Sequence, residues 1–242
     1  MTDFVQLWVY LSSTPLFGLT ATLVVYVSAQ AFYARMQQAP WANPVLWSVV
    51  VLAGALTLTG TAYPTYFSGA QFIHFLLGPA VVALGWPLWQ RRSALRARGA
   101  RFVAAALIGG SAAAGSAVLF AWALGLPHEV LLSLAPKSVT APVAMGVAEK
   151  IGGIPALAAV FAVVTGLVGA LSGKYLFDAI GIATDGNGWI ARGFALGTAS
   201  HGIGAARALQ VNAEAGAWAA LALGLQAVLA SVLIPLVSAI IG

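Results

Sequence analysis

The chain has 242 residues, of which 61% are hydrophobic and only 7% are charged, and its formal net charge is +5. Soluble domains carry about 25% charged residues, so the composition excludes a soluble globular protein and indicates an integral membrane protein. The absence of cysteine excludes disulfides, thiol catalysis and cysteine-based metal sites.

Long apolar runs without alternating strands favour membrane-spanning helices over a β-barrel. We therefore expect an all-α, polytopic helical bundle that forms a single transmembrane domain over residues 1–242. About 20 apolar residues are needed for one crossing. By this measure the predicted spans are 5–32, 45–62, 70–89 with Gly78-Pro79 in its middle, 102–124, 154–172 and 216–240. The first is read as a retained helix, since it exceeds signal-peptide length and lacks a basic start.

The densest basic stretch, QRRSALRARGAR at 90–101, is predicted to be a loop between two spans. Lys and Arg concentrate in cytoplasmic loops, so this loop is expected inside the cell and the N-terminus outside. A contact with anionic lipids is compatible with that role. No basic face with interleaved aromatic residues is present, so the positive charge does not indicate nucleic-acid binding.

Two further segments have membrane length but are interrupted by polar residues, Pro and Gly. They are LLSLAPKSVTAPVAMGVAEK at 131–150 and RGFALGTASHGIGAARALQ at 192–210. An offset of 62 aligns Leu134 with Leu196 and Ser138 with Ser200, and a clean apolar span follows each segment. This indicates a weak internal repeat and an inverted-repeat architecture. Whether each segment crosses the membrane or re-enters it is left open.

The predicted helix breaks are Pro136, Pro142, Gly197, Gly202 and Gly204. Proline removes a helix donor and glycine weakens a helix, and such breaks persist in a membrane only where protein or water satisfies the freed backbone groups. Broken helices in corresponding positions of two repeats are typical of a transporter's binding site, and helix N-termini suit an anion. The alternative is that the prolines only kink structural helices.

The polar residues near the breaks suit a small carboxylate. Lys137 and Arg207 would attract its charge, although their long stems also allow both side chains to reach lipid headgroups. His201 is a candidate proton carrier, as is Glu149, but a neutral buried histidine is the alternative. The complete set of candidate substrate-binding residues is Lys137, Ser138, Thr140, Thr198, Ser200, His201 and Arg207.

The motifs of known enzyme classes are missing, so we expect no enzyme, no cofactor and no metal. Ser200 and His201 are adjacent, and adjacent side chains on a helix do not face each other. The string GTASHG is not a nucleophile elbow, and GIGAARAL lacks the strand–helix context of a dinucleotide turn. The histidines at 74, 128 and 201 have no metal-ligand spacing, and His74 is read as structural.

Three strings, LLGPAVVALGWPLWQR, SLAPKSVTAPVAMGVAEKIGGIPALAAVFAVVTGLVGALSG and ALGTASHGIGAARALQ, resemble the LrgB/CidB family in order and spacing. The match runs from about Tyr66 to the C-terminus, and the two preceding spans also agree. The chain departs from the family pattern at Gly146 and Gln210, where acidic residues are typical, which bears on ion coupling or substrate choice.

The resemblance implies one of two functions. Family members are described as carriers of small monocarboxylates such as pyruvate, glycolate or glycerate, a class to which lactate also belongs. They are also described as antiholin- or holin-like modulators of murein hydrolases and autolysis. We favour the carrier, possible proton coupling included, and keep the modulator as the alternative. The resemblance further implies a bacterial inner-membrane location and a separate small LrgA/CidA-like partner. Small-residue faces favour a homo-oligomer.

Overall fold

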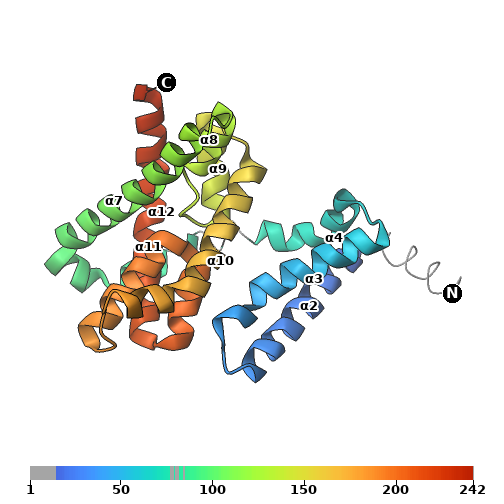
Figure 1. Cartoon of the computed structure of the whole chain (residues 1–242), viewed down its shortest axis with the longest axis horizontal. Coiled ribbons are helices and arrows are strands. Elements are labelled where there is room, and N and C mark those ends of the chain that lie inside the picture. Colours follow the sequence, from blue (N-terminus) through green and yellow to red (C-terminus); the bar gives the residue numbers. More distant parts are fainter. Residues whose placement is uncertain (1–14, 77–78, 80–81, 84, 242) are drawn as a thin grey trace, which may run out of the picture. The chain divides into compact units, whose positions relative to one another are not determined.

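The computed structural model describes residues 15–76, 79, 82–83 and 85–241, and these residues are helical and contain no strand (Figure 1). They fall into two compact units, residues 1–80 and 81–242. The predicted all-α class is therefore confirmed.

The first unit contains α2 (Pro15–Arg35), the 3-10 helix η1 (Pro40–Ala42), α3 (Pro44–Thr59) and α4 (Tyr63–Phe75). Asn43 caps α3, because its Oδ1 accepts hydrogen bonds from the backbone N–H groups of Val45 and Leu46 at 2.9 and 3.2 Å. Helix α2 packs on α4, where the hydroxyls of Thr22 and Tyr66 lie 2.6 Å apart.

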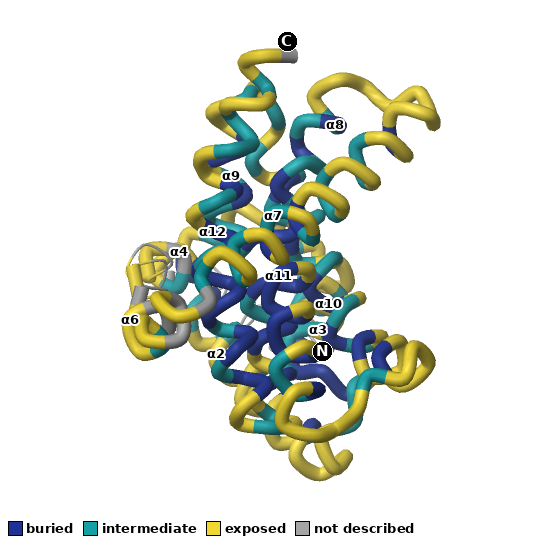
Figure 2. Tube along the Cα trace, turned by 90° about the vertical axis from the view of Figure 1, so that its left-hand side faces the viewer, coloured by how far each residue is buried: buried dark blue, intermediate teal, exposed yellow. Residues whose placement is uncertain are grey.

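The second unit contains α6 (Gly85–Gln90), α7 (Arg92–Ala123), α8 (His128–Leu134), α9 (Ala141–Ile151), α10 (Pro155–Ala179), α11 (Gly186–Val211) and α12 (Ala213–Ile241). Helices α7 and α12 run in the same direction, since Phe102 stacks near Trp218 and Gly110 lies against Gln226 further along both helices. Figure 2 shows the buried residues gathered around α11, α10 and α12.

Four helical stretches are long and apolar enough to cross a membrane: Leu16–Arg35, Gly99–Ala123, Pro155–Ala179 and Ala213–Ile240. They correspond to four of the predicted spans, although residues 5–14 of the first lie outside the described part of the chain. Helix α3 is apolar but shorter. The molecule is an integral membrane protein.

The prediction of one continuous span over 70–89 is wrong. Helix α4 begins at Tyr63, with Pro64 in its first turn where proline is well tolerated, and it ends at Phe75. The described residues then form a separate helix, α6. Gly78, in the middle of the predicted span, lies outside the described residues.

The basic segment 90–101 is not a loop, because residues 92–101 form the first turns of α7. Arginine, alanine and leucine dominate this segment and are strong helix formers, so the helix continues past the apolar residues. The side chains of Arg92, Arg96 and Arg101 are exposed. The basic residues thus extend a spanning helix beyond its apolar stretch.

Candidate functional site

Helix α11 is folded back on itself at His201. The backbone there has φ 41° and ψ −135°, which is not helical. A Cβ atom built on Gly204 would lie 2.8 Å from the carbonyl oxygen of Leu196. Residues eight apart in a straight helix are separated by about 12 Å. Residues 186–200 and 202–211 are therefore the two arms of a helical hairpin, the C-terminal hairpin, with His201 and Gly202 at its tip.

Helices α8 and α9 form a second hairpin, the N-terminal hairpin, with the turn 135–140 between them. The chain returns to α8 after α9, because the N–H of Ile154 donates to Ser133 Oγ at 2.8 Å. Pro136 lies in the turn and Pro142 in the first turn of α9, where its missing N–H is not needed. The turn ends at Thr140.

The two hairpins enter the second unit from opposite ends. Helix α10 is antiparallel to the first arm of α11, since Gly166 faces His201 while Gly173 faces Leu196. That arm runs parallel to α12, as Gly193 and Gly197 lie on the backbone of α12 residues 215 and 219. Each hairpin is followed by a full-length helix, and α10 and α12 run in opposite directions. The two hairpins and the helices that follow them are thus arranged in opposite orientations, as an inverted repeat requires.

The hairpin tips meet. A Cβ atom built on Gly202 would lie 3.8 Å from Thr140 Cγ2, which is van der Waals contact between the turn of one hairpin and the tip of the other. Figure 1 shows α8 and α9 towards the C-terminal end of α12 and α11 towards its N-terminal end. The two interrupted segments predicted from the sequence are therefore in contact.

His201 is held firmly in its unusual conformation. Its side chain is 3% exposed, and its Nε2 lies 2.7 Å from the carbonyl oxygen of Ala162 in α10. The ring fits because residue 166 is glycine: a Cβ there would lie 2.8 Å from the imidazole. A non-glycine residue with positive φ is strained, and such strain concentrates at functional sites.

Four buried side-chain atoms in this unit have no hydrogen-bond partner among the described residues. They are Ser138 Oγ, Thr140 Oγ1, Thr198 Oγ1 and Gln226 Oε1. A buried polar atom without a partner is destabilising, so such a cluster points to a bound solute or water. Three of the four belong to the predicted binding set. Gln226 was missed, although a lone amide inside the apolar span 216–240 is itself a signal.

Two cavities in the second unit extend to the hairpin tips. One is on the side of the N-terminal hairpin and the other on the side of the C-terminal hairpin. The first, of about 620 Å³, lies between α7, the N-terminal hairpin and α12, and contains Ser138 and Gln226; we name it the Ser138 cavity. The second, of about 610 Å³, lies between α7 and the first arm of α11, and contains Arg101 and Thr198; we name it the Thr198 cavity. Adjacent glycines of α7, Gly109 and Gly110, line one cavity each.

The remaining predicted site residues are Ser200, Lys137, Arg207 and Glu149, and they lie in different surroundings. Ser200 packs against α10, where a Cβ on Gly169 would lie 2.6 Å from its Cβ. Lys137 is half-buried in the turn 135–140, where its backbone N–H donates to the carbonyl of Leu134 at 3.1 Å. Arg207 is half-buried in the second arm of the C-terminal hairpin, and Glu149 is exposed near the end of α9.

Of the three glycines predicted as breaks, only Gly202 is at the interruption. Gly197 is helical and lies on the backbone of Ala219 in α12, and Gly204 lies on the carbonyl of Leu196. Both are needed for close approach of helices, which a single sequence does not distinguish from a break.

Gly197→Ala is expected to destabilise the second unit by about 1–3 kcal/mol, because the added Cβ would overlap the backbone of α12, which cannot rotate away. Thermal unfolding in detergent measures the effect. Gly115→Ala is the matched control, since a Cβ there meets nothing within 4 Å. Equal melting temperatures for the two variants would contradict the packing described for α11 and α12.

A buried arginine that sequence reasoning did not single out fixes the base of the C-terminal hairpin. Arg192 is 7% exposed, and its Nη2 lies 2.8 Å from Asp178 Oδ1 at the end of α10. Its guanidinium also donates to the carbonyl of Ile182. The contact ties the first arm to α10, so the arm cannot move without breaking an ion pair whose arginine is buried and whose aspartate is exposed.

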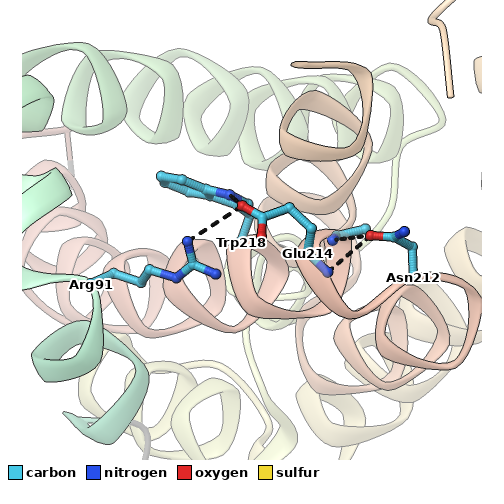
Figure 3. A network of polar contacts seen from close by, with 5 residues as sticks. Arg91, Asn212, Glu214 and Trp218 are labelled. Carbon is cyan, nitrogen blue, oxygen red and sulfur yellow. Dashed lines mark hydrogen bonds and ion pairs between the residues drawn. The ribbon is translucent and has the colours of Figure 1, made fainter. Parts of the chain in front are cut away.

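A second polar network fixes the start of α12 (Figure 3). Asn212 Oδ1 accepts from the N–H groups of Glu214 and Ala215, as a helix cap does. Trp218 Nε1 donates to Glu214 Oε1 at 2.6 Å, and Arg91 lies 3.4 Å from the same oxygen and 4.9 Å above the indole. Polar contacts thus fix the two ends of the C-terminal hairpin away from its tip. At the tip, His201 bonds to the carbonyl of Ala162.

The sequence is similar to known proteins over most of its length. The model of the LrgB-like family matches residues 22–240. The chain is 33% identical over 216 residues to "Uncharacterized protein YxaC" of Bacillus subtilis, covering 89% of this chain and 92% of that protein. It is 31% identical over 238 residues to "Holin-like protein CidB" of Staphylococcus aureus, covering 97% of each. No solved structure matches.

Proposed function

This chain belongs to the LrgB-like family, and on that premise we propose that it is a secondary carrier that moves a small monocarboxylate across the membrane. The observation that carries the proposal is the meeting of two opposed re-entrant hairpins, with orphan polar atoms buried around their tips. Broken helices of two inverted repeats that meet inside the membrane are the usual form of a carrier's binding site.

An anionic solute suits this site. The N-cap residue of α9, Thr140, makes no side-chain cap hydrogen bond, so the first N–H groups of α9 face the hairpin tips without a side-chain cap. Lys137 contributes a positive charge in the same turn, and Arg101 another in the Thr198 cavity. Ser138, Thr140 and Thr198 add hydroxyls that lack partners among the described residues.

Alternating access follows from the two cavities. The Ser138 cavity and the Thr198 cavity approach the hairpin tips from opposite ends and are lined by the same helix, α7. Opening one while closing the other requires movement of the hairpins against α7 and α12. His201, at the tip, is the proposed proton carrier if transport is coupled to protons.

A holin-like role is the second candidate, and the comparisons support it more directly than they support any particular substrate. The Staphylococcus aureus relative is named holin-like, and the alignment covers nearly all of both chains. In this reading the chain would modulate murein hydrolases and autolysis as an oligomer, with a small LrgA/CidA-like partner in the bacterial inner membrane. The polar hairpin tips would then line a pore or an oligomer interface.

Uptake into proteoliposomes that contain this chain alone separates the two candidates. We expect saturable uptake of labelled pyruvate or glycolate, and a reduction of about tenfold or more in Thr198→Val, which keeps the shape but removes a buried hydroxyl. Thr57→Val is the matched control, since its exposed hydroxyl bonds to the carbonyl of Ala53. Folded protein without uptake, together with large oligomers, would overturn the carrier and favour the holin-like role.

A further inference from the structure

Arg101 lines the Thr198 cavity and lies near the start of the apolar stretch Gly99–Ala123 of α7. Its side chain is exposed, and its guanidinium forms no ion pair or hydrogen bond with the described residues. Two nearby carboxylates are already paired with other arginines, since Asp178 pairs with Arg192 and Glu214 with Arg91. The positive charge of Arg101 is therefore not neutralised by an acidic partner in the described part of this unit.

The acidic residue at the start of the first arm of α11 does not neutralise Arg101 either. Asp185 is the cap of that arm, and its Oδ1 accepts the N–H of Gly188 at 2.7 Å. The lining residue in this first turn is instead Asn187, which carries an amide and no charge. Arg101 is thus the one charged residue among the described residues that line the Thr198 cavity.

The Thr198 cavity follows one face of α7 inwards from Arg101. Residues Arg101, Ala105 and Gly109 recur at intervals of four, so they share a helix face, and all three line the cavity. A Cβ built on Gly109 would lie 3.2 Å from Thr198 Cγ2, which places the inner end of the cavity at the C-terminal hairpin. Eight residues of helix span about 12 Å, and helix side chains lean towards the N-terminus, here away from Gly109. The guanidinium therefore lies at the outer end of the cavity, its mouth.

The walls beside this mouth are aromatic. Phe102, the next residue of α7, has its ring centroid 5.5 Å from that of Phe194 and 5.0 Å from that of Trp218. All three side chains line the Thr198 cavity. Apolar walls around a cleft that carries one sign of charge focus its electric field, so the mouth attracts anions more strongly than an open surface would.

The Ser138 cavity has no comparable charge. Its described lining residues include no lysine, arginine, aspartate or glutamate. It contains His128, but a histidine is not a fixed cation near neutral pH. The two cavities thus differ in charge, although they have nearly the same volume and are lined by the same helix, α7.

We propose that Arg101 forms an outer binding position for the carboxylate, at which the anion is captured before it reaches the hairpin tips. The inference rests on the proposed carrier function. It adds a residue outside both hairpins and makes the carrier asymmetric, with an anion-capturing mouth on the Thr198 cavity and none on the Ser138 cavity.

The test is equilibrium exchange of labelled pyruvate or glycolate, whichever the wild type takes up, in proteoliposomes with equal solute on both sides. Exchange requires every molecule to load through both cavities, whichever way it is inserted. We expect Arg101→Gln to raise KM about fivefold with little change in the maximal rate, because a charge that captures the anion is lost. The KM of the wild type should also rise with salt, which screens the charge, and that of the variant should rise less.

Chemical restoration of the charge separates capture from a structural effect. The chain has no cysteine, so Arg101→Cys can be labelled fully with a thiosulfonate reagent that carries a positive or a negative group. The positive group should return KM towards the wild-type value, and the negative group should raise it further.

Arg96→Gln and Arg96→Cys are the matched controls, since Arg96 is exposed on the same helix and lines neither cavity. Equal KM values for Arg101→Gln and Arg96→Gln, or a KM in Arg101→Cys that ignores the sign of the label, would overturn this inference and leave the carrier intact. A thiol at position 101 that the reagents cannot reach would overturn it as well. Absence of exchange in the wild type would overturn the carrier itself, and this inference with it.

Discussion

His201→Gly is expected to abolish solute uptake while leaving the protein folded. The substitution removes the imidazole that bonds to the carbonyl of Ala162, next to Gly202, the residue that contacts the other hairpin. It also removes backbone strain, because φ 41° and ψ −135° are values that glycine adopts readily and other residues do not. Uptake of labelled monocarboxylate and thermal unfolding, measured on the same preparation, test both parts.

His201→Ala provides the matched comparison for this prediction. Alanine loses the same bond but keeps the strain, so the alanine variant should be less stable than the glycine variant by about 1–3 kcal/mol. Both variants should lack uptake if the imidazole takes part in transport. Normal uptake in His201→Gly would contradict a role for the side chain and would leave His201 as a structural residue that holds the tip on α10.

The membrane-spanning helices were predictable because each coincides with a continuous run of apolar residues long enough for one crossing. The predicted spans 154–172 and 216–240 lie within α10 and α12, whose bounds the structure extends only at the ends. Hydropathy did not predict the start of α7, because residues 92–101 are helical but not apolar. Arginine and alanine, which favour helix, extend α7 beyond its apolar stretch.

The interruptions were also predictable, but the residue at the C-terminal tip was not. Proline and glycine identify where a helix is weak, and this located the turn 135–140. In α11 the reversal occurs at His201, whereas Gly197 and Gly204 serve close packing. The reason is tertiary: a contact with the carbonyl of Ala162 in α10 holds the strained backbone, and no local sequence rule anticipates it.

Sequence analysis did not single out Arg192 or Gln226, because what makes each of them notable is a contact with a residue distant in sequence. Arg192 marked the edge of a predicted segment, but its pairing with Asp178 follows only from the way α10 and α11 meet. Gln226 differs, because an amide inside span 216–240 was visible in the sequence. What the sequence lacked was Gly110, whose position beside Gln226 shows that the amide reaches a cavity.

The pair Thr140→Cys with Gly202→Cys is expected to form a disulfide under oxidation and to stop uptake. Thr140 Cγ2 lies 3.8 Å from a Cβ built on Gly202, which brings the two Cβ atoms close to the separation of about 3.5–4.5 Å that a disulfide needs. The chain contains no cysteine of its own, so the introduced pair has no competing thiols. Uptake before oxidation, after oxidation and after reduction is the measurement.

The disulfide should stop uptake because it would prevent the two hairpin tips from moving relative to each other. A solute can pass between the Thr198 cavity and the Ser138 cavity only if the hairpin tips move apart or slide, and a covalent bond between the tips prevents this. Reduction should restore uptake, and the single variants should not respond to oxidation. A disulfide that forms fully and leaves uptake unchanged would show that the tips stay together during transport, and the alternating movement of the two hairpins would be wrong. If no disulfide forms, the tips are not adjacent in the membrane, and the site described above does not exist.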